Sequence, residues 1–439
     1  MKKRKLLVSL LLTLIVVNKM SAQDEMTLKQ CVDLGLNNNL TIKKSGLEID
    51  KSKQKEWEVI SAAFPQITPM VTLNDNLILA TSLIPGVIVG KSGYIPVRFG
   101  TQYNISAGVN TSITLDYSTL FLAHKASAET RNLAELNKEK IEQQVAYNIA
   151  VAYYNIQMAN EQRKITEENL KKTDALVATT KVQYENGIVK KMDYQRLLVN
   201  QNNLTTELQN NTNNYLYYFL ALKFQMGIPL DSSIAVNQNI EQLKIEESTA
   251  GASANNIDLK IFDQQKILND LNIKQTWAGY YPRLTANASY LVQSYQNDNI
   301  AFKYWYGNSV VGGTLSFPIF DGLTKKFKVD QLKIQQSQLE LDHKYASENI
   351  KLSIINATNK LKFNQVDLQG QDSNRKMAEE IYSASLEQYK EGISTLSDLL
   401  NMEFSMKEAQ TRYLQALVRV KQAELELLYN NGNIQSLTK

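Results

Sequence analysis

Cysteine and histidine are almost absent from this chain of 439 residues, which contains one cysteine and two histidines. Cys31 alone cannot form a disulfide within the chain or a thiolate metal site, and His124 and His343 lie too far apart in sequence to form a local ligand motif. The sequence also contains no nucleophile elbow, phosphate-binding loop or metal-ligand spacing. We therefore expect no enzyme activity, no cofactor and no resident metal ion, and we expect these three residues to have structural roles.

An excess of charge of one sign is also missing once the N-terminus is set aside. The formal net charge is +4, but the first 22 residues contain five basic and no acidic residues. The remaining chain has 43 basic and 44 acidic residues, which is a net charge of −1. A nucleic-acid partner is therefore excluded, because such proteins carry a clustered positive charge.

Residues 1–22 are typical of a secretory signal peptide, with a basic cluster, an apolar run over 6–17 and the small residues Ser21 and Ala22. A membrane-spanning anchor would need about 20 apolar residues. No cysteine follows the run closely enough to be lipidated, and no other long apolar run exists. The exported chain is therefore either soluble outside the inner membrane or held in an outer membrane by strands.

An internal repeat organises the rest of the chain. Its first part, at 38–42 and 64–67, recurs at 255–259 and 281–284 with an offset of 217. Its second part recurs with an offset of 205, so the first copy has a loop 12 residues longer between Pro65 and Asp116. We divide the chain into residues 1–22, a first repeat 23–254 and a second repeat 255–439. The pairs at offset 205 are Asp116 with Asp321, Tyr184 with Tyr389, Gly187 with Gly392, and Asp193 with Asp398.

Glycine and proline are concentrated in two segments of the chain, and their absence elsewhere predicts very long helices. Between Gly108 and Gly187 there is neither residue, and between Gly322 and Gly392 the only interruption is Gly370. Helices of about 70 residues would be roughly 100 Å long. Six of the seven prolines lie in or at the edge of 64–116 and 281–321, namely Pro65, Pro69, Pro85, Pro96, Pro282 and Pro318.

Apolar residues of the long helices recur at near-heptad spacing, which predicts a coiled-coil seam. An amphipathic helix on an ordinary core would explain the stripe but not the length. Gly187 and Gly392 are expected to end the helices, because glycine readily adopts the positive φ of a helix C-terminus, and the chain should turn back there as a helical hairpin. The seam residues are Ile141, Val145, Ile149, Ala152, Ile156, Ala159, Ala416, Val420, Ala423 and Leu427.

The proline-bounded segments alternate between apolar and polar residues, which predicts two β-hairpins at about 66–116 and 283–318. An ordinary half-exposed sheet would give the same alternation. The uncharged polar face, the tyrosines and Trp305 near the strand ends, and the export signal favour membrane-spanning strands. Four strands cannot close a barrel, so the chain must oligomerise, giving eight strands in a dimer or twelve in a trimer. A water-filled conduit favours the trimer or a larger ring.

The residues resemble the TolC-type outer-membrane efflux protein family over almost the whole mature chain. The resemblance depends on the duplicated Asn-x-Leu/Ile helix, the Phe/Tyr-Pro before each first strand, the sequence Phe-Pro-Ile-Phe-Asp-Gly at 317–322, and the paired Tyr-x-x-Gly-x-x-x-x-x-Asp motifs. It implies an α+β fold of long coiled-coil helical hairpins and four transmembrane strands per chain. The helix–strand junctions are then Pro65, Asp116, Pro282, Pro318, Asp321 and Gly322.

Family membership would imply a homotrimer with a twelve-stranded outer-membrane β-barrel in outer-membrane lipid and a periplasmic helical tunnel. An equatorial collar would be formed by residues 226–255 and the C-terminal tail. The trimer would bind a periplasmic adaptor protein and, through it, an inner-membrane pump of the RND, ABC or a similar class. Its function would be that of a passive exit duct for solutes or polypeptides, powered by the partner pump. The exported substrate does not follow from the sequence.

The resemblance also implies a gate at the periplasmic end, closed by the second helical hairpin. Its acidic ring would be formed by Asp398, with Tyr389 and Gly392 at the turn. Three Asp398 side chains around one axis would repel one another, favour cations and bind a divalent ion when the gate is closed. A solvated carboxylate at a helix tip is the alternative. The matching residues of the first hairpin are Tyr184, Gly187 and Asp193.

This chain departs from the family pattern at two gate positions. Ser394 replaces an arginine that bonds across to the first hairpin, and Asn401 stands where some members have a second acidic ring. Lys190 and Lys191, close to Asp193, are candidates for other locking bonds.

Two other classes of protein remain as alternatives. A periplasmic adaptor protein also has a signal peptide and a long helical hairpin, but usually a single hairpin flanked by compact strand domains. An exported enzyme needs convergent carboxylates or histidines on loops, which this sequence does not offer. Either protein would be soluble without detergent, whereas a membrane barrel would not.

Overall fold

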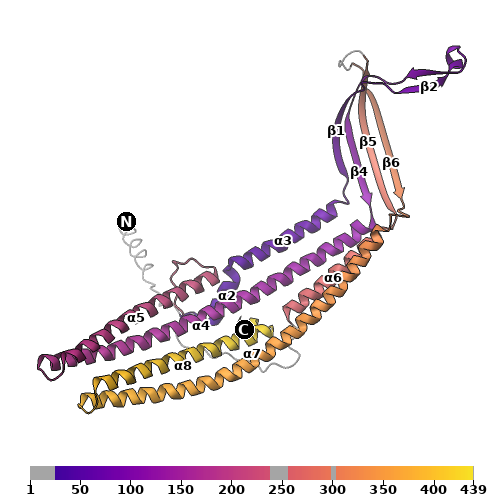
Figure 1. Ribbon diagram of the computed structural model, residues 1–439. Helices are drawn as coiled ribbons and strands as arrows, with labels where there is room; N and C mark the ends of the chain where they lie inside the picture. The colour runs from indigo at the N-terminus through magenta and orange to yellow at the C-terminus, as the bar shows by residue number, and fades with distance from the viewer. Residues whose placement is uncertain (1–24, 238–255, 298–302, 439) are drawn as a thin grey trace, which may run out of the picture. The chain divides into compact units, whose positions relative to one another are not determined.

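The computed structural model describes residues 25–237, 256–297 and 303–438 (Figure 1). It is mainly helical with a small antiparallel sheet, so the predicted α+β fold is confirmed. The expected signal peptide 1–22 and most of the expected collar segment 226–255 lie outside the described residues. The α-helices are α2 (Leu28–Asn38), α3 (Leu40–Ser61), α4 (His124–Glu185), α5 (Lys191–Met226), α6 (Ile257–Ala278), α7 (Thr324–Lys390) and α8 (Leu396–Asn430).

The chain divides into two compact units, which we call the strand unit and the helical unit. The strand unit comprises Glu48–Glu135 and Phe262–Asp342. The helical unit comprises the described residues up to Leu47 together with Leu136–Ile261 and those from His343 onward. Each unit draws on both sequence repeats, so the two copies are interleaved and neither copy forms a unit of its own.

The strand unit contains a four-stranded antiparallel sheet in the order β1-β4-β5-β6. The outer strands are β1 (Gln66–Asp75) and β6 (Tyr306–Ser316), and the inner strands are β4 (Tyr103–Leu115) and β5 (Arg283–Gln296). This confirms four strands, two from each copy. The inner strands join the copies in one register, which runs from Tyr103 opposite Gln296 to Leu115 opposite Leu284.

Close approach between the copies explains a glycine in this joint. A Cβ atom added to Gly108 would lie 2.1 Å from the main-chain oxygen of Tyr290 on β5. No side chain fits in that space, so any larger residue would push the two inner strands apart. Gly108 is therefore a requirement of the β4–β5 pairing.

The connection between β1 and β4 contains a second, two-stranded sheet that sequence patterning did not predict. Strands β2 (Thr81–Pro85) and β3 (Tyr94–Arg98) pair antiparallel, and the 3-10 helix η1 (Gly86–Val89) follows β2. The sequence predicted only a longer loop here. Two prolines, Pro85 and Pro96, interrupt the alternation and hide both strands from a periodicity argument.

The two long helical hairpins are confirmed. Helix α4 has 62 residues and α7 has 67, which at 1.5 Å per residue makes each about 90–100 Å long. Helices α5 and α8 return along them with 36 and 35 residues. Gly370 lies inside α7 without ending it. Helix α7 is thus one continuous element, because a single glycine costs an interior helix only about 1 kcal/mol.

The predicted seams are buried. Apart from Ile141 and Ala159, which are half-buried, all the predicted seam residues of α4 and α8 are buried. The main core of the helical unit also includes Cys31 and Val32 of α2, which are fully buried, and Ile434 near the C-terminus. Cys31 is therefore a structural residue, as expected. Helix α2 and the C-terminal segment thus pack on the α4 seam, whereas Val420, Ala423 and Leu427 of the α8 seam pack against Ala357 and Leu361 of α7.

Within the residues that the structure describes, no helix combines the length and the apolar character that crossing a membrane requires.

Truncating the seam should destabilise the helical unit. Ile149 has no exposed surface and contacts the backbone of Gly35, so Ile149→Ala should lower the free energy of unfolding by about 2–4 kcal/mol. Denaturant titration in detergent, followed by helical circular dichroism, measures this loss. Ile355→Ala on the exposed surface of α7 is the matched control and should change the unfolding free energy by less than about 0.5 kcal/mol. Equal effects of both substitutions would contradict the assigned core.

Candidate functional site

The tips of the two helical hairpins have the same backbone geometry. Gly187 has φ +73° and Gly392 has φ +75°. At the first tip the amide of Gly187 donates to the oxygen of Tyr184, and the amide of Ile188 donates to that of Gln183. The same pair of bonds recurs at residues 388–393. This is a Schellman turn, and it explains physically why both copies carry the motif Tyr-x-x-Gly-Ile.

Asp398 begins α8 as part of a capping box with Thr395. The hydroxyl and the amide of Thr395 donate to Oδ2 of Asp398 at 2.6 and 3.2 Å, and the amide of Asp398 donates back to the Thr395 hydroxyl. Hydrogen bonds from Thr395 lower the pKa of Asp398 below its ordinary value. Both bonds use the same carboxylate oxygen, and the residue is exposed. Asp398 therefore stays ionised, and its negative charge also stabilises the N-terminus of α8.

The first hairpin lacks this capping box. Lys190 occupies the N-cap position of α5 and makes no side-chain capping bond. Asp193 is half-buried, and its amide donates to the main-chain oxygen of Lys190. In the described residues no ion pair joins Lys190 or Lys191 to the second hairpin. Tyr184 instead stacks on Tyr194, with ring centroids 5.6 Å apart.

An apolar cluster joins the two hairpins just behind their tips. It combines Leu176 and Leu197 of the first hairpin with Tyr382, Leu399 and Met406 of the second. Burial, followed by the charge of Glu403, raises the pKa of Tyr382 to about 12. Tyr389, which the sequence placed at the gate, packs against the edge of this cluster. The two tips are thus held together by packing as well as by polar contacts.

Near the tips, two residue pairs that were not predicted from the sequence join the hairpins through three hydrogen bonds. Nη1 of Arg196 donates to the Ser397 hydroxyl at 2.9 Å. The side-chain amide of Asn200 donates to both carboxylate oxygens of Glu403, at 2.9 and 3.1 Å. Glu403 is buried and has Nζ of Lys407 at 3.5 Å. We call the Arg196–Ser397 and Asn200–Glu403 pairs the cross-hairpin bonds.

The two positions at which the sequence departs from the family pattern have different surroundings. The Ser394 hydroxyl lies 3.5 Å from the main-chain oxygen of Ser385, so it contacts its own hairpin. Asn401 is exposed and lines a groove of about 730 Å³ between α5 and α8. Arg196 and Glu403 line the same groove. The arginine that crosses between the hairpins therefore comes from the first hairpin in this chain, from Arg196.

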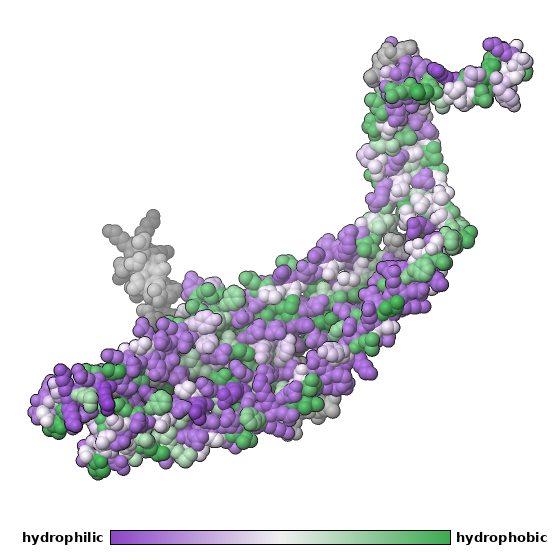
Figure 2. Space-filling view, viewed as in Figure 1, coloured by the Kyte–Doolittle hydropathy of each residue, from purple (hydrophilic) through white to green (hydrophobic). Residues whose placement is uncertain are grey.

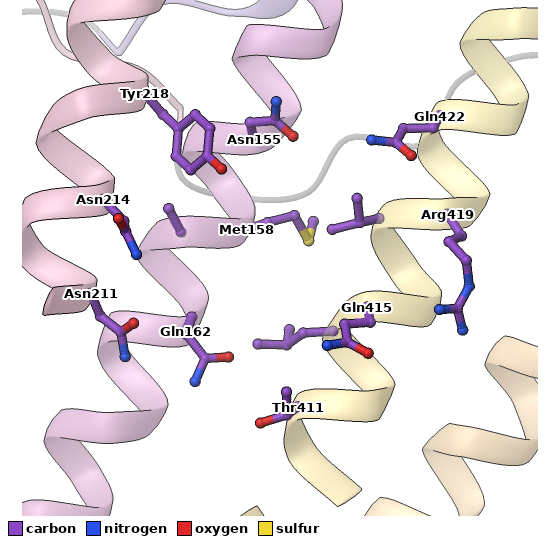
Figure 3. Close-up of a pocket in the computed structure, with 13 residues that line it drawn as sticks. Asn155, Met158, Gln162, Asn211, Asn214, Tyr218, Thr411, Gln415, Arg419 and Gln422 are labelled. Atoms are coloured by element: carbon purple, nitrogen blue, oxygen red, sulfur yellow. The ribbon is translucent and has the colours of Figure 1, made fainter. Parts of the chain in front are cut away.

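A second groove lies between the hairpins, farther along the helices, and its lining is rich in amides. Figure 3 shows Asn155 and Gln162 of α4, Asn214 of α5 and Gln415 of α8 directed into it. Its volume is about 550 Å³, and Arg419 is its only charged lining residue. Along this stretch the groove is lined by uncharged polar side chains together with the apolar residues Met158, Leu414 and Val418.

The junction residues Asp116 and Asp321 lie where strand changes to helix. Asp116 precedes the π-helix η2 (Ser118–Ala123), which leads directly into α4, and Asp321 lies three residues before the start of α7. Asp116 accepts bonds from the amide and hydroxyl of Ser118 and from Arg283 at the start of β5. Burial opposes its ionisation, but the Ser118 bonds and the charge of Arg283 hold the pKa of Asp116 below its ordinary value. Asp321 accepts from the amide and Nζ of Lys325, and these contacts lower its pKa. Both copies thus use an aspartate as a helix cap.

The other junction residues lie at strand and helix boundaries. Pro65 directly precedes β1 and Pro282 directly precedes β5. Pro318 follows the end of β6, and Gly322 has φ +69° where the chain turns into α7. The sequence repeat therefore marks the points at which helix changes to strand. No group of three or more histidine, cysteine, aspartate or glutamate side chains that could hold a metal ion occurs among the described residues.

Comparison with known proteins places the chain among outer-membrane channels. The family model for outer membrane efflux proteins matches residues 32–228 and 251–432. The fold resembles the Campylobacter jejuni CmeC outer membrane channel, with TM-score 0.71 and 16% identity over 92% of this chain and 85% of that chain. It also resembles the open-state MtrE channel of Neisseria gonorrhoeae, with TM-score 0.71 and 15% identity over 94% and 90% of the two chains.

A third solved structure, the outer membrane protein VceC of Vibrio cholerae, gives TM-score 0.70 and 14% identity over 92% of this chain and 96% of that chain. At such identities these likenesses concern the fold alone. No curated protein matches the chain.

Removing the buried carboxylate of the cross-hairpin bonds should loosen the tips. Glu403→Ala leaves the Asn200 amide and the Lys407 ammonium without their partner, which should lower the free energy of local opening by about 1–3 kcal/mol. Amide hydrogen exchange of peptides covering 190–205 and 392–406 measures this, and a loss of about 1.4 kcal/mol is a tenfold faster exchange. Glu408→Ala, which removes an exposed pair with Arg412, is the control and should leave exchange nearly unchanged. Indistinguishable exchange in the two variants would contradict the role of Glu403.

Proposed function

The chain belongs to the outer membrane efflux protein family, and from that premise we propose that three copies close one shared β-barrel and form the exit duct. As a family member the protein lies in the outer membrane, with its long helices in the periplasm. The family consists of ducts rather than enzymes. The arrangement of three copies is our inference from the strand unit.

The two open edges of the four-stranded sheet carry this proposal. One edge is β1 and the other is β6, and each presents a row of backbone amides and carbonyls with no partner in the sheet. Hydrocarbon cannot hydrogen-bond to these groups, so each edge needs a strand from another chain. Because all neighbours in the sheet are antiparallel, β6 of one chain can pair antiparallel with β1 of the next. Head-to-tail pairing of this kind closes into a ring.

The number of strands favours three copies. Two copies would give eight strands, and barrels of that size are filled by their own side chains. Three copies would give twelve strands and a wider, water-filled interior. A duct for solutes or polypeptides needs the wider ring, because its cargo has to pass through a water-filled interior.

The internal β4–β5 joint provides a template for the joint between subunits. Thr111 on β4 lies opposite Ile67, and Leu315 on β6 lies opposite Leu284, so the strand pairing makes Thr111 and Leu315 equivalent. Their offset is 204, one residue less than the offset of 205 that relates Asp116 to Asp321 and the hairpin tips. Within the chain Thr111 pairs with Ala288, whose equivalent at the offset of 217 is Val71. We therefore expect Leu315 to lie opposite Val71 of the partner subunit.

We assign the hairpin tips to the gate and Asp398 to its ring. Asp398 is exposed, ionised and fixed by Thr395, and its Oδ1 is left for water or a cation. The cross-hairpin bonds would hold the closed state. A periplasmic adaptor protein, coupled to an inner-membrane pump, would open the gate by binding the open arrangement more tightly. The pump supplies the energy, and passage through the duct is diffusion.

Disulfide trapping tests the ring. The variant Val71→Cys with Leu315→Cys should form covalent trimers on a non-reducing gel, because each chain is linked to both neighbours. Cys31 is buried and does not compete. Val71→Cys with Ser316→Cys is the control, since a shift of one residue places the second thiol on the opposite face of the strand. If the largest covalent species contains two chains, the trimer is wrong. If only the control pair forms the disulfide, the proposed pairing of Leu315 with Val71 of the partner subunit is wrong.

Single-channel recording tests the gate assignment. Asp398→Asn removes the charge but keeps an oxygen that can accept the Thr395 bonds, so the helix cap is preserved. We expect loss of cation preference and of block by divalent ions in planar bilayers. Asp193→Asn, at the matching position of the first hairpin, is the control and should keep both properties. Unchanged selectivity and block in Asp398→Asn would remove this residue from the ring.

A further inference from the structure

The β2–β3 hairpin is present in only one of the two sequence copies. It fills the connection between Asp75 and Tyr103, whereas the corresponding connection of the second copy has only the residues between Gln296 and Tyr306. Figure 1 shows the hairpin projecting from the end of the sheet that lies away from the helices attached to it. Neither the duct nor the gate described above requires it.

The exposed surface of this hairpin is aliphatic where a loop in water would be polar. Leu77, Ile78, Val87 and Ile88 are between 72% and 87% exposed, and the residues at the tip are Val87, Ile88 and Val89. Inside the hairpin, Ile84 and Ile95 face each other across the strands and are half-buried. A two-stranded sheet has no further core in which to bury apolar residues. Figure 2 shows hydrophobic residues also exposed on the four-stranded sheet, in contrast to the hydrophilic surface of the helices.

The charges of the hairpin have a single sign. Between residues 76 and 102 the only charged side chains are Lys91 and Arg98, and both are exposed. Lys91 directly follows the glycine that ends the aliphatic tip. Exposed aliphatic residues accompanied by cations and by no acid match the boundary between lipid tails and anionic headgroups.

Exposed aromatic residues occur at the base of the hairpin and at the adjacent end of the sheet. Tyr94 and Phe99 on or next to β3, and Tyr304, Trp305 and Tyr306 at the start of β6, are all exposed. All of them occur at or beyond the same end of the sheet, the end from which the hairpin projects (Figure 1). Aromatic belts of membrane barrels lie at headgroup level. The hairpin thus projects from the end of the sheet at which these aromatic residues lie.

We propose that the β2–β3 hairpin lies on the lipid surrounding its own barrel, with Val87, Ile88 and Val89 inserted below the headgroups. Lys91 and Arg98 contact anionic headgroups. Three such hairpins around the outer rim would fix the depth and tilt of the barrel in the membrane. This inference depends on the strands crossing the outer membrane and does not depend on the gate.

Spin labelling of the full-length channel tests the proposal. A nitroxide on Ile88→Cys is compared with one on Ile188→Cys, an exposed isoleucine at the tip of the first helical hairpin, in vesicles of phosphatidylethanolamine and phosphatidylglycerol. Cys31 is buried and stays unlabelled. We expect the ratio of oxygen to nickel-chelate accessibility to be several-fold higher for the label at position 88. A ratio equal to that at position 188 would overturn the proposal.

Two further readouts exclude other locations for the tip. Dipolar broadening between the labels at position 88 would mean that the three tips meet one another over the pore, and this would overturn lipid insertion. The accessibility ratio should fall when Lys91→Gln is combined with Arg98→Gln, and also when phosphatidylglycerol is replaced by phosphatidylcholine. If neither change lowers the ratio, the contact with anionic headgroups is wrong. Conductance of the same sample distinguishes a failure of this inference from a failure of the proposed duct. A conducting channel with a water-exposed tip overturns only this inference, whereas a non-conducting sample with an inserted tip overturns only the proposed duct.

Discussion

Hydrogen bonding of the backbone in hydrocarbon is the constraint on which the rest of this architecture depends. A chain that contributes only β1, β4, β5 and β6 to the membrane leaves a strand edge on each side. Each unpaired amide or carbonyl in lipid costs several kcal/mol. The proposed pairing of each edge with a strand of another copy removes this cost.

The helical unit meets a different requirement, which is to be long and rigid yet able to change at one end. Its main core, around Val32, Ile149 and Ile434, is densely apolar. Between the hairpins, polar contacts in the amide-lined groove and the cross-hairpin bonds accompany the apolar cluster behind the tips. Polar contacts in a partly hydrated groove can be exchanged for water at small net cost, whereas buried aliphatic contacts cannot. Movement between the hairpins at their tips therefore has to break the apolar cluster around Leu197 and Leu399 as well as the polar contacts.

The features that could be predicted from the sequence are those with a regular residue spacing and the glycines that interrupt such a spacing. The 3.5-residue seam, the two-residue alternation and the glycines at 187 and 392 each produce a local pattern, and the helices, strands and tips agree with it. Thr395-x-x-Asp398 matches the capping-box pattern, so this helix N-terminus could have been predicted from the sequence. The Asn200–Glu403 bond joins residues about 200 positions apart, so no local spacing indicates it. Strands β2 and β3 were missed because their prolines disrupt the alternation.

The joint between β4 and β5 links the two copies in the same antiparallel manner that the sheet edges require of separate chains. Half-length ancestors with one strand pair each would have needed six subunits around the ring, all identical by symmetry. In the ring of three chains that we propose, joining two such halves in one polypeptide lowers that symmetry to threefold. Alternate positions are then free to diverge, so that one hairpin can begin its return helix with Thr395 and the other with Lys190.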